Sequence, residues 1–362
     1  MGKSNQKAFN NLVKIVRHIA DNLIIIEIIP TGIDLEIGNE DISRVKIEHG
    51  IGTNLIYSIL YNLVTQLKAS LQIVISSRKV DNWIFYLGDS MILPMIAANL
   101  TRKRTILLLG GNLELENHYQ SFENNISKIF LLFRNINLFL ADQLVLYSSG
   151  LIMRWKLEKH TKKISIAHEH ILDSNRLEIT TPLEGRSIII GYVGNLGRIK
   201  GVMNLIKSIP SILKDLPDVK FSIIGDGELR GEIEDFILKN NLQKIVDLEG
   251  WVQYEHISEH LNELRLLIIP SYSEGLPNVM IEAMACGTPV LATSVGAIPD
   301  IIDNGKTGFL MDNNESDTIA REVLRILREE NLVRVSNSAQ NYVKKEFSED
   351  EAVRLWTGVL IS

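Results

Sequence analysis

Apolar residues occur along the chain in short blocks separated by mixed segments. The blocks Leu23 to Ile29, Trp83 to Leu87 and Thr105 to Leu109 are almost continuously apolar, which predicts strands covered on both faces of a parallel sheet. Further strands are predicted at 44–47 and 143–147, and helices at 7–20, 54–67 and 125–141. This alternation of strands with helices predicts an α/β fold.

The second half of the chain repeats the alternation with more regular spacing. We predict strands at 187–193, 220–224, 245–248, 266–269 and 289–292. We predict helices at 201–213, 228–239, 279–285 and 316–328. The capping box Ser348-Glu349-Asp350-Glu351 begins a final helix. The expected result is a doubly wound α/β domain.

Residues 172–186 show no regular periodicity, and we expect them to be a linker. A chain of 362 residues is long enough for two domains. We therefore expect an N-terminal domain over 1–171 and a C-terminal domain over 187–346. A final helix over 347–362 is expected to return to the N-terminal domain.

The net charge of −6 argues against a general nucleic-acid-binding protein. Residues 1–185 carry 20 basic and 18 acidic side chains, whereas residues 186–362 carry 18 and 26. Cys286 is the only cysteine, so an internal disulfide is excluded and a reducing compartment, the cytoplasm, is expected. Apolar runs are all far shorter than the ~20 residues that cross a bilayer.

A glycine-containing turn follows the first predicted strand of the second half. Gly194 and Asn195 lie in the turn, and Arg198 and Lys200 come just before the next helix. Glycine lets the backbone approach a phosphate closely, and a helix N-terminus with two nearby cations favours an anion. The turn therefore predicts a phosphate-binding site, although such turns are often only turns.

A second turn, with Gly225 and Gly227, follows the next predicted strand. It is expected at the same carboxyl edge of the sheet, where open α/β sheets bind ligands. A tight turn in which Asp226 caps the helix is an equal alternative.

The strongest signal lies in residues 270–290. Glu274 in a loop is followed eight positions later by Glu282, which lies within an otherwise apolar predicted helix. Pro277 stands at the helix start, where a missing N–H costs nothing, and the free N–H groups near Asn278 point at the loop. A buried carboxylate such as Glu282 needs a hydrogen-bond partner, and sugar hydroxyls would serve.

This segment resembles the E-x7-E motif of retaining glycosyltransferases of family 4, the glycogen-synthase-like enzymes with the GT-B fold. The similarity continues through 291–302 and 305–310 and covers most of residues 187–346. It implies two Rossmann-like, doubly wound domains facing a cleft. It also implies an enzyme of polysaccharide biosynthesis that moves a hexose from a nucleotide-diphosphate sugar to a hydroxyl of a glycan or lipid-linked acceptor, with the anomeric configuration retained.

The resemblance further implies roles for single residues. Glu282 corresponds to the glutamate that hydrogen-bonds the donor ribose, and Glu274 to the one that faces the donor sugar. Lys200 corresponds to the lysine that neutralises the leaving diphosphate, and Arg198 is expected to add a second cation. The other donor-binding residues are expected to be Gly194, Asn195, Gly225, Gly227, Gly275, Leu276, Pro277 and Asn278.

Neither a metal nor a cofactor is expected. The sequence contains no Asp-x-Asp motif, and fixed positive charge can take the place of a metal beside a departing nucleotide. His168 and His170 flank Glu169, but two histidines are too few for a metal site, so polar contacts in the cleft are expected. Cys286 is expected to be a packed small residue rather than a nucleophile.

Two features depart from the family pattern. Asn195 stands where the family commonly has arginine. The strand and glycine-rich loop that usually precede the first helix are expected to be either lost or reduced to a remnant at Lys3 to Lys7. Gly50-Ile51-Gly52 is either a phosphate-side loop or a plain turn. These departures keep open a non-catalytic or weakly active homologue that binds sugar nucleotides. A nucleotide-sugar 2-epimerase is a minor third interpretation.

Residues 128–140 predict an apolar helix with Lys128 and Arg134 at the edges of its apolar surface. This helix lies in the half of the chain that has a positive net charge. Such a helix either packs in a core or lies on anionic lipid headgroups. The second interpretation would make the protein peripheral to a membrane that carries a lipid-linked acceptor.

Overall fold

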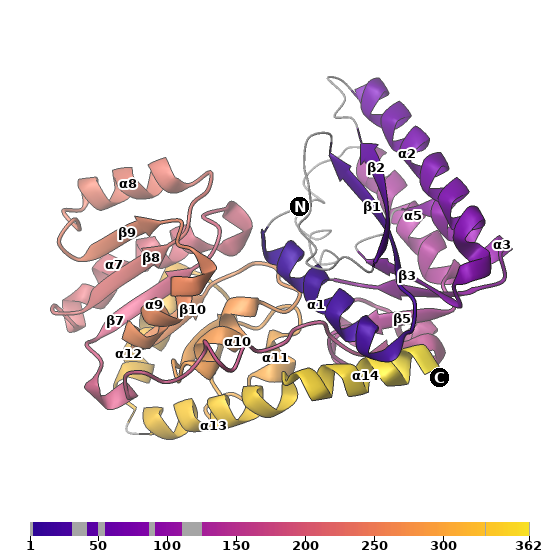
Figure 1. Ribbon diagram of the computed structural model, residues 1–362. Coiled ribbons are helices and arrows are strands. Elements are labelled where there is room, and N and C mark those ends of the chain that lie inside the picture. Colours follow the sequence, from indigo (N-terminus) through magenta and orange to yellow (C-terminus); the bar gives the residue numbers. More distant parts are fainter. Residues whose placement is uncertain are drawn as a thin grey trace. The chain divides into compact units, whose positions relative to one another are not determined.

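The computed structural model describes residues 3–30, 42–49, 55–86, 91–110, 125–329 and 331–361. The chain forms two compact units (Figure 1). The first unit contains Met1–His170 and Glu349–Ser362, and the second contains Ile171–Ser348. The segment Gly50-Ile51-Gly52 lies outside the described residues, so both interpretations of it stay open.

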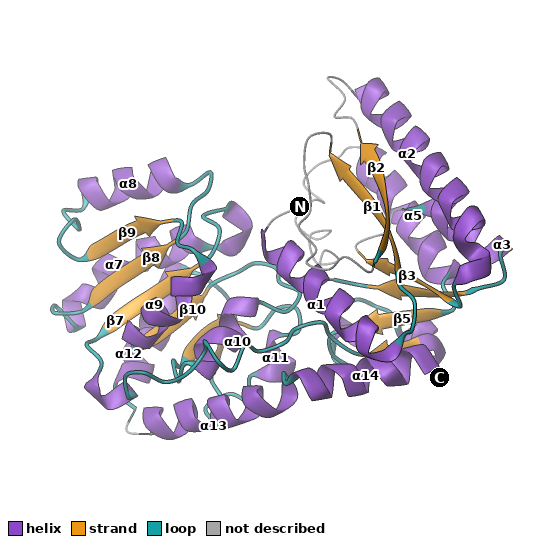
Figure 2. Ribbon diagram, in the orientation of Figure 1, coloured by secondary structure: helices purple, strands orange, loops and turns teal. Residues whose placement is uncertain are grey.

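The described strands of the first unit form two parallel sheets rather than one (Figure 2). The smaller sheet pairs β1 (Ile24–Pro30) with β2 (Ser43–His49), and Ile25 lies opposite Arg44. The larger sheet has the order β3-β4-β5-β6. Its strands are β3 (Asn82–Tyr86), β4 (Arg104–Leu108), β5 (Gln143–Leu146) and β6 (Ile164–Ile166).

Helices of the first unit come from both ends of the chain. They are α1 (Lys3–Ile19), α2 (Leu55–Ser76), α3 (Ile92–Leu100), α5 (Asn125–Leu140), α6 (Leu151–Arg154) and α14 (Glu349–Ile361), with 3₁₀ turns η1 (Ser77–Lys79) and η3 (Glu158–Lys163). Lys14 on α1 forms an ion pair with Glu349 on α14 at 2.5 Å. Trp356 of α14 is fully buried and donates its Nε1 hydrogen to the carbonyl of His168 at 3.1 Å. The last helix is therefore an integral part of the first unit.

The second unit contains a six-stranded parallel sheet with the order β12-β11-β10-β7-β8-β9. Its strands are β7 (Ile189–Val193), β8 (Lys220–Ile224), β9 (Val246–Gly250), β10 (Leu266–Ile269), β11 (Val290–Thr293) and β12 (Phe309–Met311). The chain adds β8 and β9 on one side of β7 and then returns to add β10 on the other. The strand order therefore reverses between β7 and β10, which is where doubly wound sheets bind ligands.

Helices cover this sheet and bury apolar side chains against it. They are α7 (Val202–Asp215), α8 (Arg230–Lys239), α9 (Ile257–Glu263), α10 (Asn278–Ala285), α11 (Ile298–Ile301), α12 (Ser316–Leu327) and α13 (Leu332–Glu346), with 3₁₀ turns η4 (Leu183–Gly185), η5 (Arg198–Lys200) and η6 (Tyr254–His256). Phe221 and Phe309 are among its fully buried side chains. A parallel sheet with both faces covered explains the continuously apolar strands of the sequence.

Residues 172–186, which we expected to be a linker, belong to the second unit. Arg186 at their end is buried, and its guanidinium donates to the carbonyls of Leu264 and Cys286 at 3.0 and 2.7 Å. It also donates to the Thr288 hydroxyl at 2.7 Å. Asn262 holds the same segment further, since it accepts the N–H of Thr180 at 2.8 Å and donates to the carbonyl of Glu178 at 2.9 Å.

Across the described residues, we find no helix with the length and apolar character needed to span a membrane.

Candidate functional site

The side chains of Lys200 and Glu274 meet at the point where the strand order reverses. Lys200 ends η5, in the turn that leaves β7, and Glu274 lies in the loop that leaves β10. Because β7 and β10 are parallel neighbours, their outgoing segments lie side by side. Lys200 Nζ lies 2.7 Å from Oε1 and 2.8 Å from Oε2 of Glu274. The two residues, 74 positions apart, form a close ion pair.

Glu274 is buried, with 8% of its surface exposed, and its carboxylate is hydrogen-bonded accordingly. In addition to Lys200, the hydroxyl of Ser271 donates to Oε1 at 2.7 Å. Hydrogen bonds from charged donors offset the cost of removing a carboxylate from water. Ser271 was missed by the sequence analysis, although its position three residues before Glu274 is the signal that could have found it.

Close backbone contacts fix the segments that carry the ion pair. Gly201 has a φ of +65°, and a Cβ atom there would lie 1.9 Å from the carbonyl oxygen of Pro270. Gly296 has a φ of +57°, and its Cβ would lie 2.1 Å from the carbonyl oxygen of Glu274. Neither space accepts a side chain, so glycine at both positions lets the loops from β7, β10 and β11 approach one another.

The two glycine turns expected to bind phosphate pack directly against each other. A Cβ atom on Gly225 would lie 1.8 Å from the carbonyl oxygen of Gly194, and one on Gly227 would lie 2.8 Å from the backbone of Leu196. Asn195 donates from its side-chain amide to the carbonyl of Asp226 at 3.1 Å. In this structure Asn195 therefore joins the two turns.

Asp226 accepts a hydrogen bond from the N–H of Gly227 at 2.8 Å through its side chain. The tight turn that the sequence left as an alternative is therefore present. Asp226 does not cap the helix, however, because the N-cap of α8 is Leu229 and no side chain caps it.

The contacts of Arg198 are with Glu228 and α8 rather than with the Lys200–Glu274 pair. Its guanidinium bonds Glu232 on α8 at 2.7 Å, and its side chain is 71% exposed. Its backbone N–H donates to the side chain of Glu228 at 3.1 Å. The structure thus brings together Lys200 and Glu274 but directs Arg198 toward α8, so its role as a second cation stays a prediction.

The remaining predicted donor residues lie at the start of α10 and within it. Leu276 and Pro277 are buried, Pro277 immediately precedes the helix, and Asn278 is its first residue. The carbonyl of Gly275 accepts the N–H of Ala297 at 2.8 Å. Glu282 is buried on the same helix with 7% of its surface exposed, among apolar neighbours in the sequence.

Tyr192 and Cys286 are the titratable groups most perturbed near these carboxylates. Burial and, second, the charge of Glu274 raise the pKa of the Tyr192 phenol well above its ordinary value. Its hydroxyl donates to the carbonyl of Asn195 at 2.7 Å, which supports the turn after β7. Burial, followed by the charge of Glu282, raises the pKa of Cys286 to about 12, so the thiol stays protonated at neutral pH and is a poor nucleophile.

His168, Glu169 and His170 form a buried polar cluster in the first unit. The Tyr147 hydroxyl donates to Glu169 Oε1 at 2.7 Å. The His170 ring lies edge-on to Tyr147, with centroids 5.3 Å apart, and its centroid is 6.0 Å from that of His168. Within the described ranges, no group of three or more His, Cys, Asp or Glu side chains is arranged to hold a metal ion.

Replacing Glu169 by glutamine is expected to change how stability depends on pH. Burial raises the pKa of Glu169 from 4.5 to about 7, against the lowering effect of the Tyr147 hydrogen bond. The folded state therefore holds a proton that the unfolded state has lost, and stability falls as pH rises from 4.5 to about 7. The loss over that window amounts to about 3 kcal/mol.

Urea unfolding of both proteins at pH 5 and pH 8 measures this effect. The free energy of unfolding of Glu169→Gln, relative to the natural protein, is expected to be higher at pH 8 than at pH 5. An equal difference at both pH values would show that Glu169 does not titrate in this range.

Comparison with known proteins decides what kind of domain carries the Lys200–Glu274 pair. Residues 175–345 match the model of the family described as "Glycosyl transferases group 1". They form a glycosyl transferases group 1 domain. Both residues of the ion pair, and all the other predicted donor-site residues, lie inside this group 1 domain.

Curated relatives of the chain are glycosyltransferases. An uncharacterized glycosyltransferase of Methanocaldococcus jannaschii is 34% identical over 162 residues, which are 45% of this chain and 44% of that protein. The capsular polysaccharide biosynthesis glycosyltransferase CapM of Staphylococcus aureus is 26% identical over 309 residues, 79% of this chain and 78% of CapM. The match to the first relative thus spans less than half its length.

Solved structures resemble the whole chain. HepE of Anabaena, in complex with UDP and glucose, has a TM-score of 0.74 at 16% identity and covers 99% of this chain and 96% of its own. Sucrose-phosphate synthase of Thermosynechococcus elongatus has a TM-score of 0.72 at 18% identity and covers 96% and 90%. At these identities the likeness concerns the fold, and the GT-B fold expected from the resemblance of residues 270–310 to the E-x7-E enzymes is confirmed.

Proposed function

We propose that the protein is a retaining glycosyltransferase that moves a hexose from a nucleotide-diphosphate sugar to a hydroxyl of a glycan or lipid-linked acceptor. The Lys200–Glu274 ion pair carries this proposal. It places a cation beside a buried carboxylate at the strand-order reversal of a group 1 domain. HepE, with the same fold, was solved with UDP and glucose, which supports a donor of this class.

In this proposal Lys200 binds the diphosphate and neutralises the charge that develops on the leaving group. A cation already fixed in position stabilises such charge without further reorganisation. Glu274 holds Lys200 in position before the donor binds and faces the donor sugar afterwards. Glu282 accepts hydrogen bonds from the ribose hydroxyls, and the N–H groups of Gly275, Leu276 and Asn278 contact the diphosphate and the sugar, while Pro277, which has no N–H, shapes the loop.

We propose that the reaction needs no metal and no cofactor besides the donor, because Lys200 supplies the positive charge. Asn195 joins the two glycine turns. Because asparagine is uncharged, the diphosphate site has one positive charge fewer than it would have with arginine at this position. The first unit is proposed to bind the acceptor. The cytoplasmic location expected from the sequence stays a prediction.

A panel of nucleoside diphosphate sugars tests the function. The true donor is expected to raise the melting temperature because it binds only the folded protein. With that donor, acceptor and excess EDTA, the protein is expected to release nucleoside diphosphate and form a product with the anomeric configuration of the donor. Binding without release would support the non-catalytic homologue, and a donor sugar epimerised at C2 would support the 2-epimerase. Complete loss of transfer in EDTA, reversed by manganese, would contradict metal independence.

We further propose that the first unit contacts an anionic membrane through α2, α3 and α5, which pack beside one another (Figure 1). These three helices contain no acidic residue, and their charged residues are Lys68, Lys128 and Arg134. On α2, the described apolar side chains that are at least 45% exposed are Tyr57, Leu60, Tyr61, Leu63, Val64, Leu67, Leu71, Val74 and Ile75. Exposed apolar surface without acidic groups suits anionic headgroups.

Liposome flotation at low salt is expected to recover the protein with anionic vesicles and not with neutral ones. Salt is expected to weaken the binding because it screens the charges. The double variant Leu67→Asp with Leu71→Asp places two charges on exposed positions of α2 and is expected to stay in the soluble fraction. Leu238→Asp, on the equally exposed surface of α8, is the matched control and is expected to float. Flotation of the α2 variant equal to that of the control would contradict this surface.

A further inference from the structure

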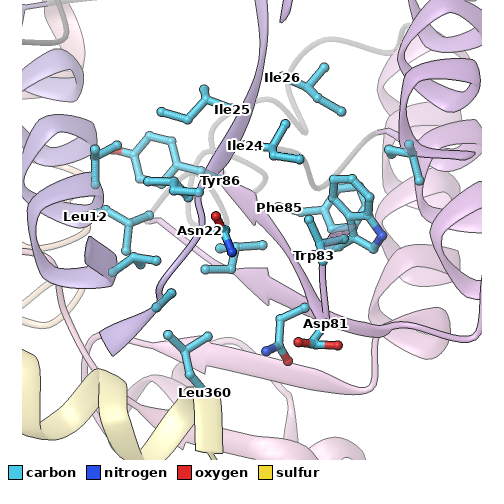
Figure 3. Close-up of a pocket in the computed structure, with 18 of the residues that line it drawn as sticks. Leu12, Asn22, Ile24, Ile25, Ile26, Asp81, Trp83, Phe85, Tyr86 and Leu360 are labelled. Carbon is cyan, nitrogen blue, oxygen red and sulfur yellow. The ribbon is translucent and has the colours of Figure 1, made fainter. Parts of the chain in front are cut away.

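A pocket in the first unit is lined by none of the predicted donor-site residues. It has a volume of about 720 Å³, and residues of α1, β1 and β3 line it (Figure 3). Figure 3 shows Leu12, Ile25, Trp83 and Phe85 around this space. This pocket is therefore not part of the donor site that we propose, which lies in the loops around Lys200 and Glu274.

The ammonium group of Lys200 has two anions to serve in the proposed reaction. It carries three N–H donors. Its contacts of 2.7 and 2.8 Å with Oε1 and Oε2 of Glu274 use two of them. A diphosphate bound at Lys200 therefore competes with Glu274 for the same donors.

The two partners of this ion pair differ in their exposure to solvent. The side chain of Lys200 is 32% exposed, whereas that of Glu274 is 8% exposed. A lysine on its flexible stem can turn toward a ligand, but a buried carboxylate that loses its donor carries an uncompensated cost of desolvation. Glu274 therefore needs another donor when Lys200 turns to the diphosphate.

The hydroxyl of Ser271 is in the position to be that donor. Its Oγ lies 2.7 Å from Oε1 of Glu274. Since an ionised carboxylate only accepts hydrogen bonds, the hydroxyl donates. Ser271 is 1% exposed, so the contact is screened from water. Among the described residues, the side chains that donate to Glu274 are those of Lys200 and Ser271.

The backbone on both sides of Ser271 is held by other segments of the second unit. The carbonyl of Pro270 accepts a hydrogen bond from the side-chain amide of Asn314 at 2.7 Å. The N–H of Tyr272 donates to the carbonyl of Ile199 in η5 at 2.9 Å. These contacts exist without a ligand, so Ser271 is fixed in position before the donor binds.

We propose that Ser271 is a positioning residue, which keeps Glu274 directed at the donor sugar after Lys200 has turned to the diphosphate. This role rests on the proposed function of Lys200 and Glu274. Before the donor binds, the two side chains share the carboxylate. Afterwards the Ser271 hydroxyl holds it, and a group that is already oriented needs no rearrangement during the reaction.

Steady-state kinetics test the proposal, with the nucleoside diphosphate sugar that raises the melting temperature most. Ser271→Ala is expected to lower kcat about tenfold, the effect of one lost hydrogen bond to a charged group. The KM for the donor is expected to change less than about twofold, because the contact acts on the reaction rather than on donor binding. Ser208→Ala removes another buried hydroxyl, on α7, and is the matched control with natural kinetics expected.

Two further variants separate hydrogen bonding from packing. Ser271→Thr keeps the hydroxyl and is expected to restore most of kcat. Ser271→Cys fills a similar space with a weak donor and is expected to stay close to the alanine variant. If Ser271→Thr does not fold, the comparison of the cysteine and alanine variants still decides.

A double-mutant cycle tests the shared contact without any substrate. Ser271→Ala in the natural chain leaves Glu274 with Lys200, whereas the same change in Lys200→Ala leaves the buried carboxylate without either donor. Ser271→Ala is therefore expected to lower the urea midpoint more in Lys200→Ala than in the natural chain. Ser208→Ala is expected to lower it equally in both. This cycle does not depend on sugar transfer, so it distinguishes a failure of this proposal from a failure of the proposed function.

Three results would overturn the role of Ser271. Equal losses from Ser271→Ala in the two chains would show that Ser271 and Lys200 do not share the carboxylate. A natural kcat in folded Ser271→Ala or Ser271→Cys would show that the reaction needs no donor at this position. A raised KM with a natural kcat would place Ser271 in donor binding instead.

Discussion

Replacing Lys200 by alanine is expected to lower the rate of sugar transfer about 100- to 1,000-fold, the range found when one preorganised donor is removed from a site where charge develops. The ammonium group lies within 2.8 Å of both carboxylate oxygens of Glu274, so its position is fixed before any donor binds. The variant lacks the cation that we propose neutralises the leaving diphosphate. It also removes a charged partner of a buried carboxylate.

Release of nucleoside diphosphate at saturating donor and acceptor measures the effect. Lys207→Ala removes the same charge from an exposed position on α7 and is expected to transfer sugar normally. Lys200→Arg keeps the charge but changes its shape, and an intermediate rate is expected. Circular dichroism checks that each variant is folded. A folded Lys200→Ala protein with the natural rate would remove Lys200 from the reaction.

Replacing Arg186 by methionine is expected to reduce the free energy of unfolding of the second unit by about 3–5 kcal/mol. The guanidinium donates to the carbonyls of Leu264 and Cys286 and to the hydroxyl of Thr288. Methionine fills similar space but donates no hydrogen bond, so these buried acceptors lose a partner. Burial lowers the pKa of Arg186 to about 10, which leaves it charged at neutral pH.

Urea unfolding of the full chain measures the loss. Arg321 lies on the exposed side of α12. Arg321→Met therefore removes a guanidinium that is exposed to solvent, and it is expected to change the free energy of unfolding by less than about 0.5 kcal/mol. Equal stability of the two variants would show that the contacts of Arg186 contribute little.

Most elements could be predicted from the sequence because buried parallel strands and amphipathic helices leave strong patterns. The strands at 220–224 and 266–269 were predicted with the bounds that the structure has. Other features lie beyond such patterns. The helices α3 and α13 and the strands β6 and β12 were not predicted, and α2 extends to Ser76 rather than 67. The described strands of the first unit form two sheets instead of one. Sheet pairing depends on contacts between distant segments, which periodicity does not record.

Only part of the candidate site could be predicted from the sequence. The spacing of Glu274 and Glu282 pointed to the loop after β10, and the glycine turn made Lys200 a candidate for binding phosphate, which stays a prediction. Their direct ion pair follows from the adjacency of β7 and β10, a property of strand order. Arg198 has the same charge and nearly the same position in the sequence as Lys200. Its contact with Glu232 depends on the direction of a side chain, which no motif specifies.

The return of α14 to the first unit sets an order of events during synthesis on the ribosome. The second unit is one continuous segment, so all its residues are available before the first unit is complete. The first unit must wait for Glu349, which binds Lys14, and for Trp356, which binds His168 across 188 positions of the chain. At about 5–20 residues per second, that delay is roughly 10–40 s. During this time the apolar surface that α14 later covers is open to chaperones.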